Sequence, residues 1–485
     1  MKRGSGILLH ITSLPSPYGI GTLGRAAFDF VNALAEAKQR YWQMLPVPPT
    51  GSTNCPYQGL SAFAINPYFI DMAGLMEDGL IHADDLLPLT QAGESGVRFD
   101  GKFKFRTSIL RKAYQNGKNK YRDEFAEYQY QNAEWLFDYS LFSAIRESFS
   151  CMPSVKWDKA FLSRKEGALV DFAKTHSEEV MSARFSQFLS EKQWKALKQY
   201  ANERGIQLIG DIPIYVSQDS ADVWAHPEMF LRGGAVAGTP PDYFNKNGQR
   251  WDNPLYDWED MKQTGYRWWI SRLRRSFELF DVVRIDHFRG FESFYAIPAG
   301  GKPKDGQWIK GPGKELFDAI DSALPHAKII AEDLGMITPE VRDLLVQCDF
   351  PGSKVLQFAF DSENSIYLPH CYPRNCVVYT GTHDNNTSRA WFRTLAPENK
   401  QRLFCYLGKE CTEQEAANWL IRLAMGSVAD ICVIPMQDVL NLGSRSRMNF
   451  PGKAKGYWEW RMRKGAFGKK QIGYLAELAD CFGRS

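Results

Sequence analysis

The chain has 485 residues, of which 44% are hydrophobic, and its 59 basic and 56 acidic side chains leave a formal net charge of only +3. This length and composition predict a large buried core, built as two or three domains or as one barrel with insertions. The near balance of charge and the lack of a long basic run exclude partners held mainly by electrostatic attraction, such as nucleic acid or an anionic membrane surface.

Other features bear on compartment and ligand class. Polar residues interrupt the apolar run of the N-terminal sequence MKRGSGILLHITSLPS, so we expect no secretory signal, and no segment reaches the ~20 apolar residues of a membrane span. Nine cysteines without a CxxC pair fit a reducing compartment, the cytoplasm or, for a mature plant-type chain, the plastid stroma. Aromatic residues make up 14% of the chain, which favours a carbohydrate ligand because sugar rings stack on Trp and Tyr.

The N-terminal part of the chain predicts the beginning of a β/α barrel. A short apolar run over 6–9 is followed by a helical pattern over 23–39 and a second apolar run over 41–47. The segment 48–59, PPTGSTNCPYQG, has the composition of a loop. Loops that follow barrel strands gather on one face, so Tyr57 in this segment is a candidate for the lining of a site, with plain packing as the alternative.

Long charged and aromatic helical patterns occupy 75–201, which we interpret as a mainly helical insertion. A strand pattern resumes over 207–216, QLIGDIPIYV, and contains Asp211. An acid inside an apolar strand needs a partner, and Arg284 is the candidate. Asp211 is then expected to support the site rather than to react.

A segment rich in Gly, Pro and aromatic residues covers 231–258 and contains Trp251 and Asn253. A structureless stretch of this length in a compact fold is usually functional, so we expect an active-site loop here. A helix is predicted over 266–277.

Residues 281–290, DVVRIDHFRG, combine a β-branched run with charged residues that follow at once, which is typical of a buried strand whose end carries chemistry. Further short apolar runs cover 328–335, 352–360, 376–385 and 431–440. About eight such runs alternate with helical patterns along the chain, which is the rhythm of a barrel. The sequence therefore predicts an α/β fold, a (β/α)8 TIM barrel with a large, mainly helical insertion between early strands. The expected division is 1–74 and 202–485 for the catalytic barrel and 75–201 for the insertion subdomain.

Three acids, Asp286, Glu332 and Asp384, follow three different predicted strands, so a barrel would bring them to one face. Retaining cleavage of a glycosidic bond uses one carboxylate as nucleophile and one carboxylic acid as proton donor, about 5 to 5.5 Å apart. A third acid can stabilise the oxocarbenium-like charge. Arg284 projects on the same side of its strand as Asp286 and can keep that carboxylate ionised; an ordinary ion pair at a strand end is the alternative.

His287 and His383 each adjoin one of these acids and are candidate donors to the same sugar. Because Asp, Glu and His also bind metals, a divalent-metal site is the rival interpretation. The chain has no HExxH motif and no helical His pair, so we expect no metal and no cofactor.

The motifs RIDHFRG, AEDLG and THDN, together with GDIPIYV and GQRWDNPLY, closely resemble the 4-α-glucanotransferases called amylomaltases or disproportionating enzymes, relatives of the α-amylases. The resemblance extends from LLHITSLPS to RMNFPG, and the five motifs occur in the family's order. It implies a retaining double displacement on α-1,4-glucans, with Asp286 as nucleophile, Glu332 as acid/base and Asp384 as transition-state stabiliser. It also implies roles in substrate binding for the remaining candidates: Arg284, His383 and Asp211 around the donor sugar, and Tyr57 and the segment around Trp251 along the cleft.

The chain departs from the family pattern at two positions. Asp252 stands where members usually carry glycine, and Tyr457 precedes Trp458 where asparagine is usual. In the α-amylases, the segment matching GDIPIYV ends with an asparagine and a histidine that help bind calcium and sugar. Here Tyr215 and Val216 stand instead, so we expect no structural calcium.

Our hypothesis from the sequence is a transglycosylase that passes segments of maltooligosaccharides or starch-type glucans to the 4-OH of an acceptor glucan or glucose. This mechanism requires a protonated Glu332, so its pKa should be raised by burial or by a neighbouring carboxylate. An α-1,4-glucan hydrolase of the α-amylase class is the alternative. A catalytically inactive glucan-binding protein is less favoured, because this chain keeps all three acids.

Overall fold

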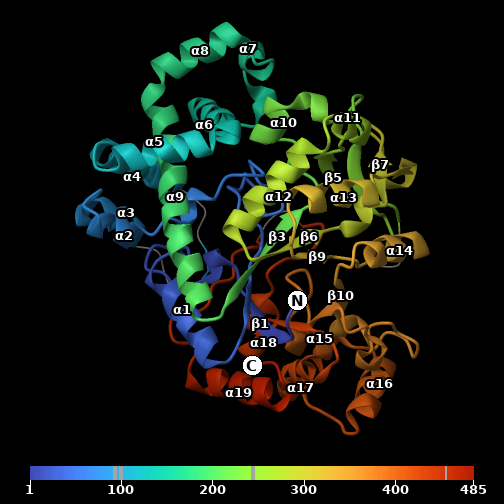
Figure 1. Ribbon diagram of the computed structural model, residues 1–485. Coiled ribbons are helices and arrows are strands. Elements are labelled where there is room, and N and C mark those ends of the chain that lie inside the picture. The colour runs from blue at the N-terminus through green and yellow to red at the C-terminus, as the bar shows by residue number, and fades with distance from the viewer. Residues whose placement is uncertain (91–95, 98–101, 242–245, 454–455) are drawn as a thin grey trace.

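Eight parallel strands form a barrel at the centre of the molecule (Figure 1). The computed structural model describes residues 1–90, 96–97, 102–241, 246–453 and 456–485. The barrel strands are β1 (Gly4–Leu8), β2 (Tyr41–Gln43), β3 (Gln207–Pro213), β6 (Val282–Asp286), β9 (Ile329–Ala331), β10 (Gly352–Val355), β11 (Cys376–Tyr379) and β12 (Ile431–Pro435). They follow the order β10-β11-β12-β1-β2-β3-β6-β9. The N–H of Ala331 donates to the carbonyl of Pro351 at 3.0 Å, which brings β9 beside β10 and nearly closes the barrel. The predicted barrel is therefore confirmed.

The barrel strands end earlier than the apolar runs of the sequence. The run over 41–47 is a strand only as far as Gln43, and the run over 207–216 only as far as Pro213. Val47 and Val216 are nevertheless buried, with 4% and 5% of their surface exposed. Hydrophobicity here reflects burial under the loops that cover the carboxyl ends of the strands, so it does not mark where strand pairing stops.

Helices surround the barrel. They are α1 (Arg25–Glu36), α9 (Ser177–Glu203), α12 (Arg267–Leu279), α13 (Lys314–Ala323), α14 (Pro339–Gln347), α15 (Ser388–Thr394), α16 (Pro397–Leu407), α17 (Glu413–Gly426), α18 (Met436–Val439) and α19 (Lys469–Cys481). The helices predicted over 23–39 and 266–277 are α1 and α12, with ends that differ by a few residues. Phe30 of α1 packs edge-on against Trp42 of β2, with ring centroids 4.9 Å apart, which fixes this helix on the barrel wall.

The connection from β2 to β3 is mainly helical, as predicted. Before α9 it contains α2 (Met72–Glu77), α3 (Leu87–Thr90), α4 (Lys102–Gly117), α5 (Arg122–Gln131), α6 (Ala133–Ser148), α7 (Lys159–Leu162) and α8 (Glu166–Thr175). These helices stand on one side of the barrel (Figure 1). Helix α9 belongs to both parts, because Trp194 in its second half donates from Nε1 to the carbonyl of Leu279 at 2.7 Å. The division of the chain at 75 and 201 remains a prediction.

A second sheet covers one rim of the barrel. Its strands are β4 (Val236–Thr239), β5 (Gln249–Pro254), β7 (Ser293–Ile297) and β8 (Gln307–Lys310), paired antiparallel in the order β5-β4-β7-β8. The prediction of a structureless loop over 231–258 is therefore wrong, although residues 242–245 lie outside the described part. Strands β4 and β5 are short and rich in turn-forming residues. They pair with each other, and β4 also pairs with β7, more than 40 residues further along the chain, which a local pattern cannot indicate. Two short helices, α10 (Ala221–Ala225) and α11 (Trp258–Gln263), flank this segment.

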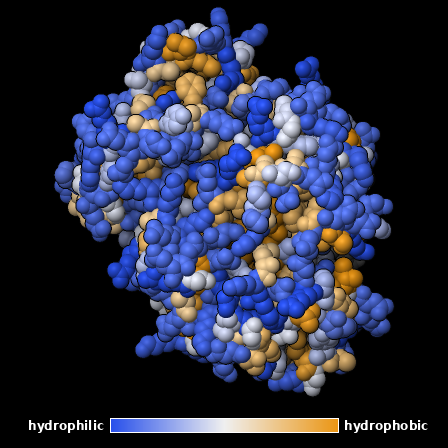
Figure 2. All heavy atoms as spheres, viewed as in Figure 1, coloured by the Kyte–Doolittle hydropathy of each residue, from blue (hydrophilic) through white to orange (hydrophobic). Residues whose placement is uncertain are grey.

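The last residues of the chain anchor the amino-terminal end of the barrel. Arg484 is fully buried, and its guanidinium donates to the carbonyl oxygens of Met425 at 2.6 Å, Gly4 at 3.0 Å, Ala429 at 2.9 Å and Ser427 at 3.0 Å. One side chain thus joins the beginning of β1 to the segment that enters β12. The face shown in Figure 2 is mostly hydrophilic, with hydrophobic side chains gathered in a band across its middle. None of the described helices is both long and apolar enough to cross a lipid bilayer.

Candidate active site

The three acids singled out in the sequence lie at the carboxyl ends of barrel strands. Asp286 is the last residue of β6, Glu332 directly follows β9, and Asp384 lies in the loop after β11. The carbonyl of Ile285 accepts from the N–H of Glu332 at 3.0 Å, so the ends of β6 and β9 are adjacent. In a parallel barrel this is the face on which side chains from different strands converge.

Arg284 connects two acids from neighbouring strands. Its Nη1 lies 2.7 and 2.6 Å from the two carboxylate oxygens of Asp211, and its Nη2 lies 3.0 Å from Oδ1 of Asp286. Burial alone would lower the pKa of Arg284, but the charges of Asp211 and Asp286 raise it well above its usual value. The guanidinium therefore stays charged and orients the Asp286 carboxylate, as the sequence predicted, while Asp211 is the buried counter-ion of Arg284.

Tyr57 and His383 complete one wall of this cluster. The Tyr57 hydroxyl donates to Oδ2 of Asp211 at 2.8 Å and lies 3.5 Å from Nδ1 of His383, and the two rings stack with centroids 5.0 Å apart. His383 in turn lies with its Nε2 3.4 Å from Oδ1 of Asp384. The loop over 48–59 and the loop after β11 are thus tied together across the top of the barrel.

Glu332 is held in a different environment from Asp286. Its two carboxyl oxygens accept backbone N–H groups, from His287 at 2.7 Å and from Leu334 at 2.9 Å. Burial, assisted by the negative charge of Asp286, raises the pKa of Glu332 to about 8 despite these hydrogen bonds and the nearby Arg284. Glu332 therefore carries a proton at neutral pH. A protonated carboxyl beside a second carboxyl that is paired with a cation is what general-acid and nucleophile roles require.

Asp384 is positioned by two residues that we did not single out in the sequence. Asn449 donates from Nδ2 to Oδ1 of Asp384 at 2.6 Å, and Arg447 donates from its guanidinium to the Asp384 carbonyl. Both belong to the motif RMNFPG, which entered the family resemblance only as a marker of its extent. The motif was visible in the sequence, but nothing local indicated that it meets a loop more than 60 residues away.

Trp251 and His287 lie together on the side of Glu332. The Trp251 ring meets the His287 ring edge-on, with centroids 4.8 Å apart. Nε2 of His287 is buried and has no hydrogen-bond partner among the described residues. Burial lowers the pKa of His287 to about 4, which leaves the imidazole neutral at working pH. Asn253 points elsewhere: its Nδ2 donates to the carbonyl of Val216 at 2.7 Å and joins β5 to the segment after β3.

The departure at Asp252 has a backbone reason. Asp252 has a φ of 60°, in the left-handed region that glycine occupies most readily. Its exposed carboxylate pairs with Arg250 at 2.6 Å, and Arg250 also donates to the carbonyl of Gly301 at 2.9 Å. The aspartate thus occupies a conformation suited to the family's glycine and makes a local ion pair.

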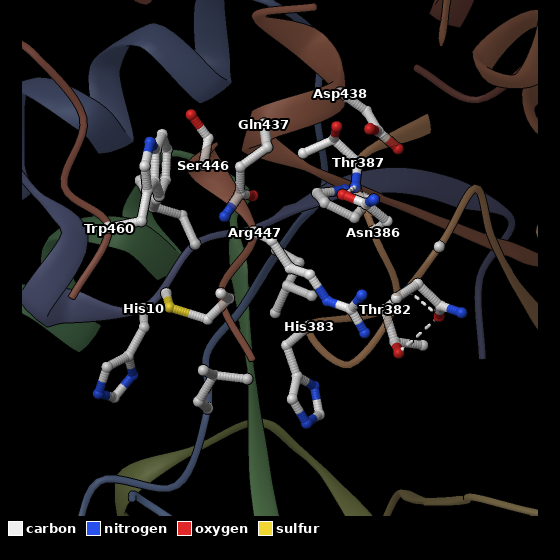
Figure 3. Close-up of a pocket in the computed structure, with 17 residues that line it drawn as sticks. His10, Thr382, His383, Asn386, Thr387, Gln437, Asp438, Ser446, Arg447 and Trp460 are labelled. Carbon is white, nitrogen blue, oxygen red and sulfur yellow. Dashed lines mark hydrogen bonds between the residues drawn. The ribbon is translucent and has the colours of Figure 1, made fainter. Parts of the chain in front are cut away.

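A pocket with both polar and apolar lining lies beside the loop that carries His383 (Figure 3). Thr382, Asn386 and Thr387 line it from that loop, and Arg447 extends across toward His383. His10, from the segment after β1, also lines the pocket; it is buried, and Nδ1 lacks a hydrogen-bond partner among the described residues. The pocket offers several hydroxyl, amide and imidazole groups, which are the partners that sugar hydroxyls need. In the described part of the chain, no group of three or more His, Cys, Asp or Glu side chains is arranged to hold a metal ion.

The pattern of the 4-alpha-glucanotransferase family matches residues 9–466. The 4-alpha-glucanotransferase of Synechocystis sp. is 45% identical over 100% of this chain and 98% of its own length, and that of Thermus thermophilus is 45% identical over 99% of both. Among solved structures, an amylomaltase from Streptococcus agalactiae in complex with acarbose superposes with a TM-score of 0.96 at 38% identity, covering 100% of both chains. An amylomaltase from Corynebacterium glutamicum, 18% identical with a TM-score of 0.82, shares the fold and covers 98% of this chain and 75% of its own.

The matched family pattern covers nearly the whole chain, and the relatives are matched over almost their full length. The barrel is the fold that the resemblance of the sequence motifs implies. This chain therefore belongs to the 4-alpha-glucanotransferase family.

Proposed function

We propose that this 4-alpha-glucanotransferase works by a retaining double displacement in which Asp286 attacks the anomeric carbon and Glu332 moves the proton. The observation that carries the proposal is the contrast between the two carboxyls. Asp286 is paired with the buried cation of Arg284, whereas Glu332 is buried beside a negative charge that keeps its proton in place.

In the first half-reaction, Oδ of Asp286 forms a bond to the anomeric carbon as the bond to the leaving glycosidic oxygen breaks, and that oxygen takes the proton of Glu332. Asn449 and His383 orient Asp384, and its carboxylate stabilises the positive charge that develops on the sugar ring. The products are a glucosyl ester on Asp286, a shortened glucan with a free 4-OH, and an ionised Glu332.

In the second half-reaction, Glu332 accepts the proton of an acceptor 4-OH, whose oxygen bonds to the anomeric carbon and displaces Asp286. The starting protonation states are restored, so no external oxidant, reductant or cofactor takes part in the balance. Trp251 and the unpaired Nε2 of His287 lie on the Glu332 side, where an acceptor sugar arrives. Acceptor binding there must exclude water for transfer to prevail over hydrolysis.

We further propose that the substrates are α-1,4-glucans and maltooligosaccharides, and that Tyr57, Asp211 and His383 bind the donor sugar. Asn253 was predicted to contact substrate; its bond to Val216 supports a role in holding β5 instead. The nine free cysteines support a reducing compartment, the cytoplasm in bacteria or the plastid stroma in plants.

Maltotriose as sole substrate tests the proposal. Transfer yields glucose and longer oligosaccharides while the total number of reducing ends stays constant, and a steadily rising number would support the hydrolase alternative instead. Asp286→Ala should abolish turnover by removing the nucleophile while leaving the thermal midpoint near that of the parent. The exposed Glu363→Ala is the matched control and should keep full activity. Substantial residual transfer by Asp286→Ala would refute the nucleophile assignment.

A further inference from the structure

A roomy surface groove lies on the opposite end of the barrel from the acids. It is lined by the 3-10 turn Pro369–Cys371, by α16 and α17, and by Phe482 just after α19. The turn precedes β11 and the end of α17 precedes β12, so the groove adjoins the amino-terminal ends of these strands, whereas Asp384 follows the carboxyl end of β11. In Figure 2, hydrophobic side chains reach the surface in the lower part of the molecule, where Figure 1 places α16 and α17. The groove is therefore separate from the catalytic face.

Four side chains with aromatic rings line this groove: His370, Tyr406, Trp419 and Phe482. Tyr406 and His370 lie nearly parallel, with centroids 5.7 Å apart, and the Tyr406 hydroxyl is 3.1 Å from Nδ1 of His370. Trp419 is partly exposed on α17, with Nζ of Lys409 4.9 Å from its ring centroid. Phe482 also lines the groove. The bond between Tyr406 and His370 fixes both rings in the absence of ligand, so little conformational freedom is lost on binding.

The polar groups of the groove identify the class of ligand. Arg422 is exposed beside Phe482, 5.4 Å from its ring centroid, and it pairs with no carboxylate among the described residues. None of the described residues that line the groove is an Asp or a Glu. A lining that combines aromatic rings with an arginine, a histidine and a serine suits a ligand that presents both apolar faces and hydroxyls. Pyranose rings have this chemistry.

We propose that this groove is a second binding site for α-1,4-glucan, which holds a long substrate chain on the enzyme away from the catalytic acids. The proposal rests on the proposed function, because it takes the substrate of the active site as the occupant. Each repeating glucose unit offers an apolar face for Trp419 or Tyr406 and hydroxyls for Arg422. Its consequence is a preference for long glucans that the active site alone does not provide, because a tethered chain raises the local concentration of its own ends.

Binding and turnover should be measured separately on the full chain. Trp419→Ala and the surface substitution Arg422→Ala should each weaken the retardation of the protein in a native gel containing amylose, by roughly 2- to 12-fold in apparent affinity for the loss of one ring or polar contact. Tyr130→Ala, which removes an aromatic ring that is 81% exposed on α5, is the control and should migrate like the parent. Calorimetry with maltoheptaose, carried out in the inactive Asp286→Ala background so that the ligand is not turned over, should detect two classes of site without a further substitution and one class when Trp419→Ala is added.

Kinetic measurements separate a failure of the second-site proposal from a failure of the proposed function. Both variants should disproportionate maltotriose at the parental rate but show a raised KM for long amylose. Equal retardation of the parent and both variants would overturn the second site, as would binding of a nucleotide such as AMP, but not of maltoheptaose, at the groove. If the parent fails to act on maltotriose, the proposed function fails, and the gel and calorimetry still report on the groove.

Discussion

Replacing Glu332 with glutamine should change how the stability of this protein depends on pH. The folded-state pKa of Glu332 is raised from 4.5 to about 8, first by burial and then by Asp286. Below pH 4.5 the carboxyl is protonated in both the folded and the unfolded state. Between pH 4.5 and 8 the unfolded chain releases the proton while the folded chain keeps it, so the free energy of unfolding falls as pH rises, and the full penalty is present above pH 8.

The size of this penalty follows from the shift. At 1.36 kcal/mol per pKa unit, a shift from 4.5 to about 8 costs about 5 kcal/mol at high pH. Glu332→Gln removes that cost but adds one that does not depend on pH, because the new amide N–H₂ faces a backbone donor, either His287 or Leu334, at ~1–3 kcal/mol. The raised pKa is therefore tested by comparing two pH values: at each one, the free energy of unfolding of the parent is subtracted from that of the variant, and the two differences are compared.

Thermal unfolding followed by circular dichroism at pH 5 and pH 9 measures this change. About 1 kcal/mol of the penalty is already present at pH 5, which leaves a change of about 4 kcal/mol between the two pH values. A chain of 485 residues has an unfolding entropy of about 1 kcal/mol/K, so the midpoint of Glu332→Gln relative to the parent should rise by about 4 °C from pH 5 to pH 9. Exposed Glu363→Gln should show no such rise. In parallel, kcat/KM of the parent should decline as pH increases through about 8, because the free enzyme loses its acid. A midpoint difference that is the same at pH 5 and pH 9 would refute the raised pKa.

Three further substitutions test the arrangement around the acids. Arg284→Met leaves Asp211 buried without its counter-charge, so the thermal midpoint should fall by an amount equivalent to ~3–5 kcal/mol. Adding Asp211→Asn to the same chain should restore part of that loss, and an unchanged midpoint in Arg284→Met would contradict the buried pair. Asn449→Ala frees Asp384 and should reduce kcat on maltotriose by about 10-fold with little change in KM, whereas an effect on KM alone would point to substrate binding by Asn449. Asp252→Gly should be more stable than Asp252→Ala by about 1 kcal/mol in thermal unfolding, because only glycine relieves the left-handed backbone; equal midpoints would count against that strain.

The sequence predicted which acids stand at the carboxyl ends of strands. Asp286 ends one β-branched run and Glu332 directly follows another apolar run, and barrel geometry brings the ends of such strands to one face. Arg284 was placed correctly because residues two apart in a strand share a side. The sequence did not reveal Asn449, since its contact with Asp384 depends on how two loops meet, and loop conformation has no periodic signal.

The antiparallel sheet of β4, β5, β7 and β8, called the rim sheet below, was not predicted for a related reason. β4 and β5 contain Gly, Asn and Pro, which favour turns when considered locally. Their hydrogen bonds come from each other and from β7, so tertiary pairing overrides local preference. This error concerned secondary structure only: Trp251 was expected in a segment beside the site, and it lies against His287 there.

Arg484 sets a limit on when this protein can finish folding during its synthesis. The hydrogen bond from its guanidinium to the Gly4 carbonyl joins residues 480 positions apart. Strand β1 also pairs with β12, which is synthesised much later. At ~5–20 residues per second on the ribosome, β1 remains without this edge partner for on the order of a minute after it emerges. The helical insertion and the rim sheet are complete in the nascent chain well before that time. An exposed strand edge in the growing polypeptide is a template for wrong pairing, so the first strand is where assistance from a chaperone would matter most.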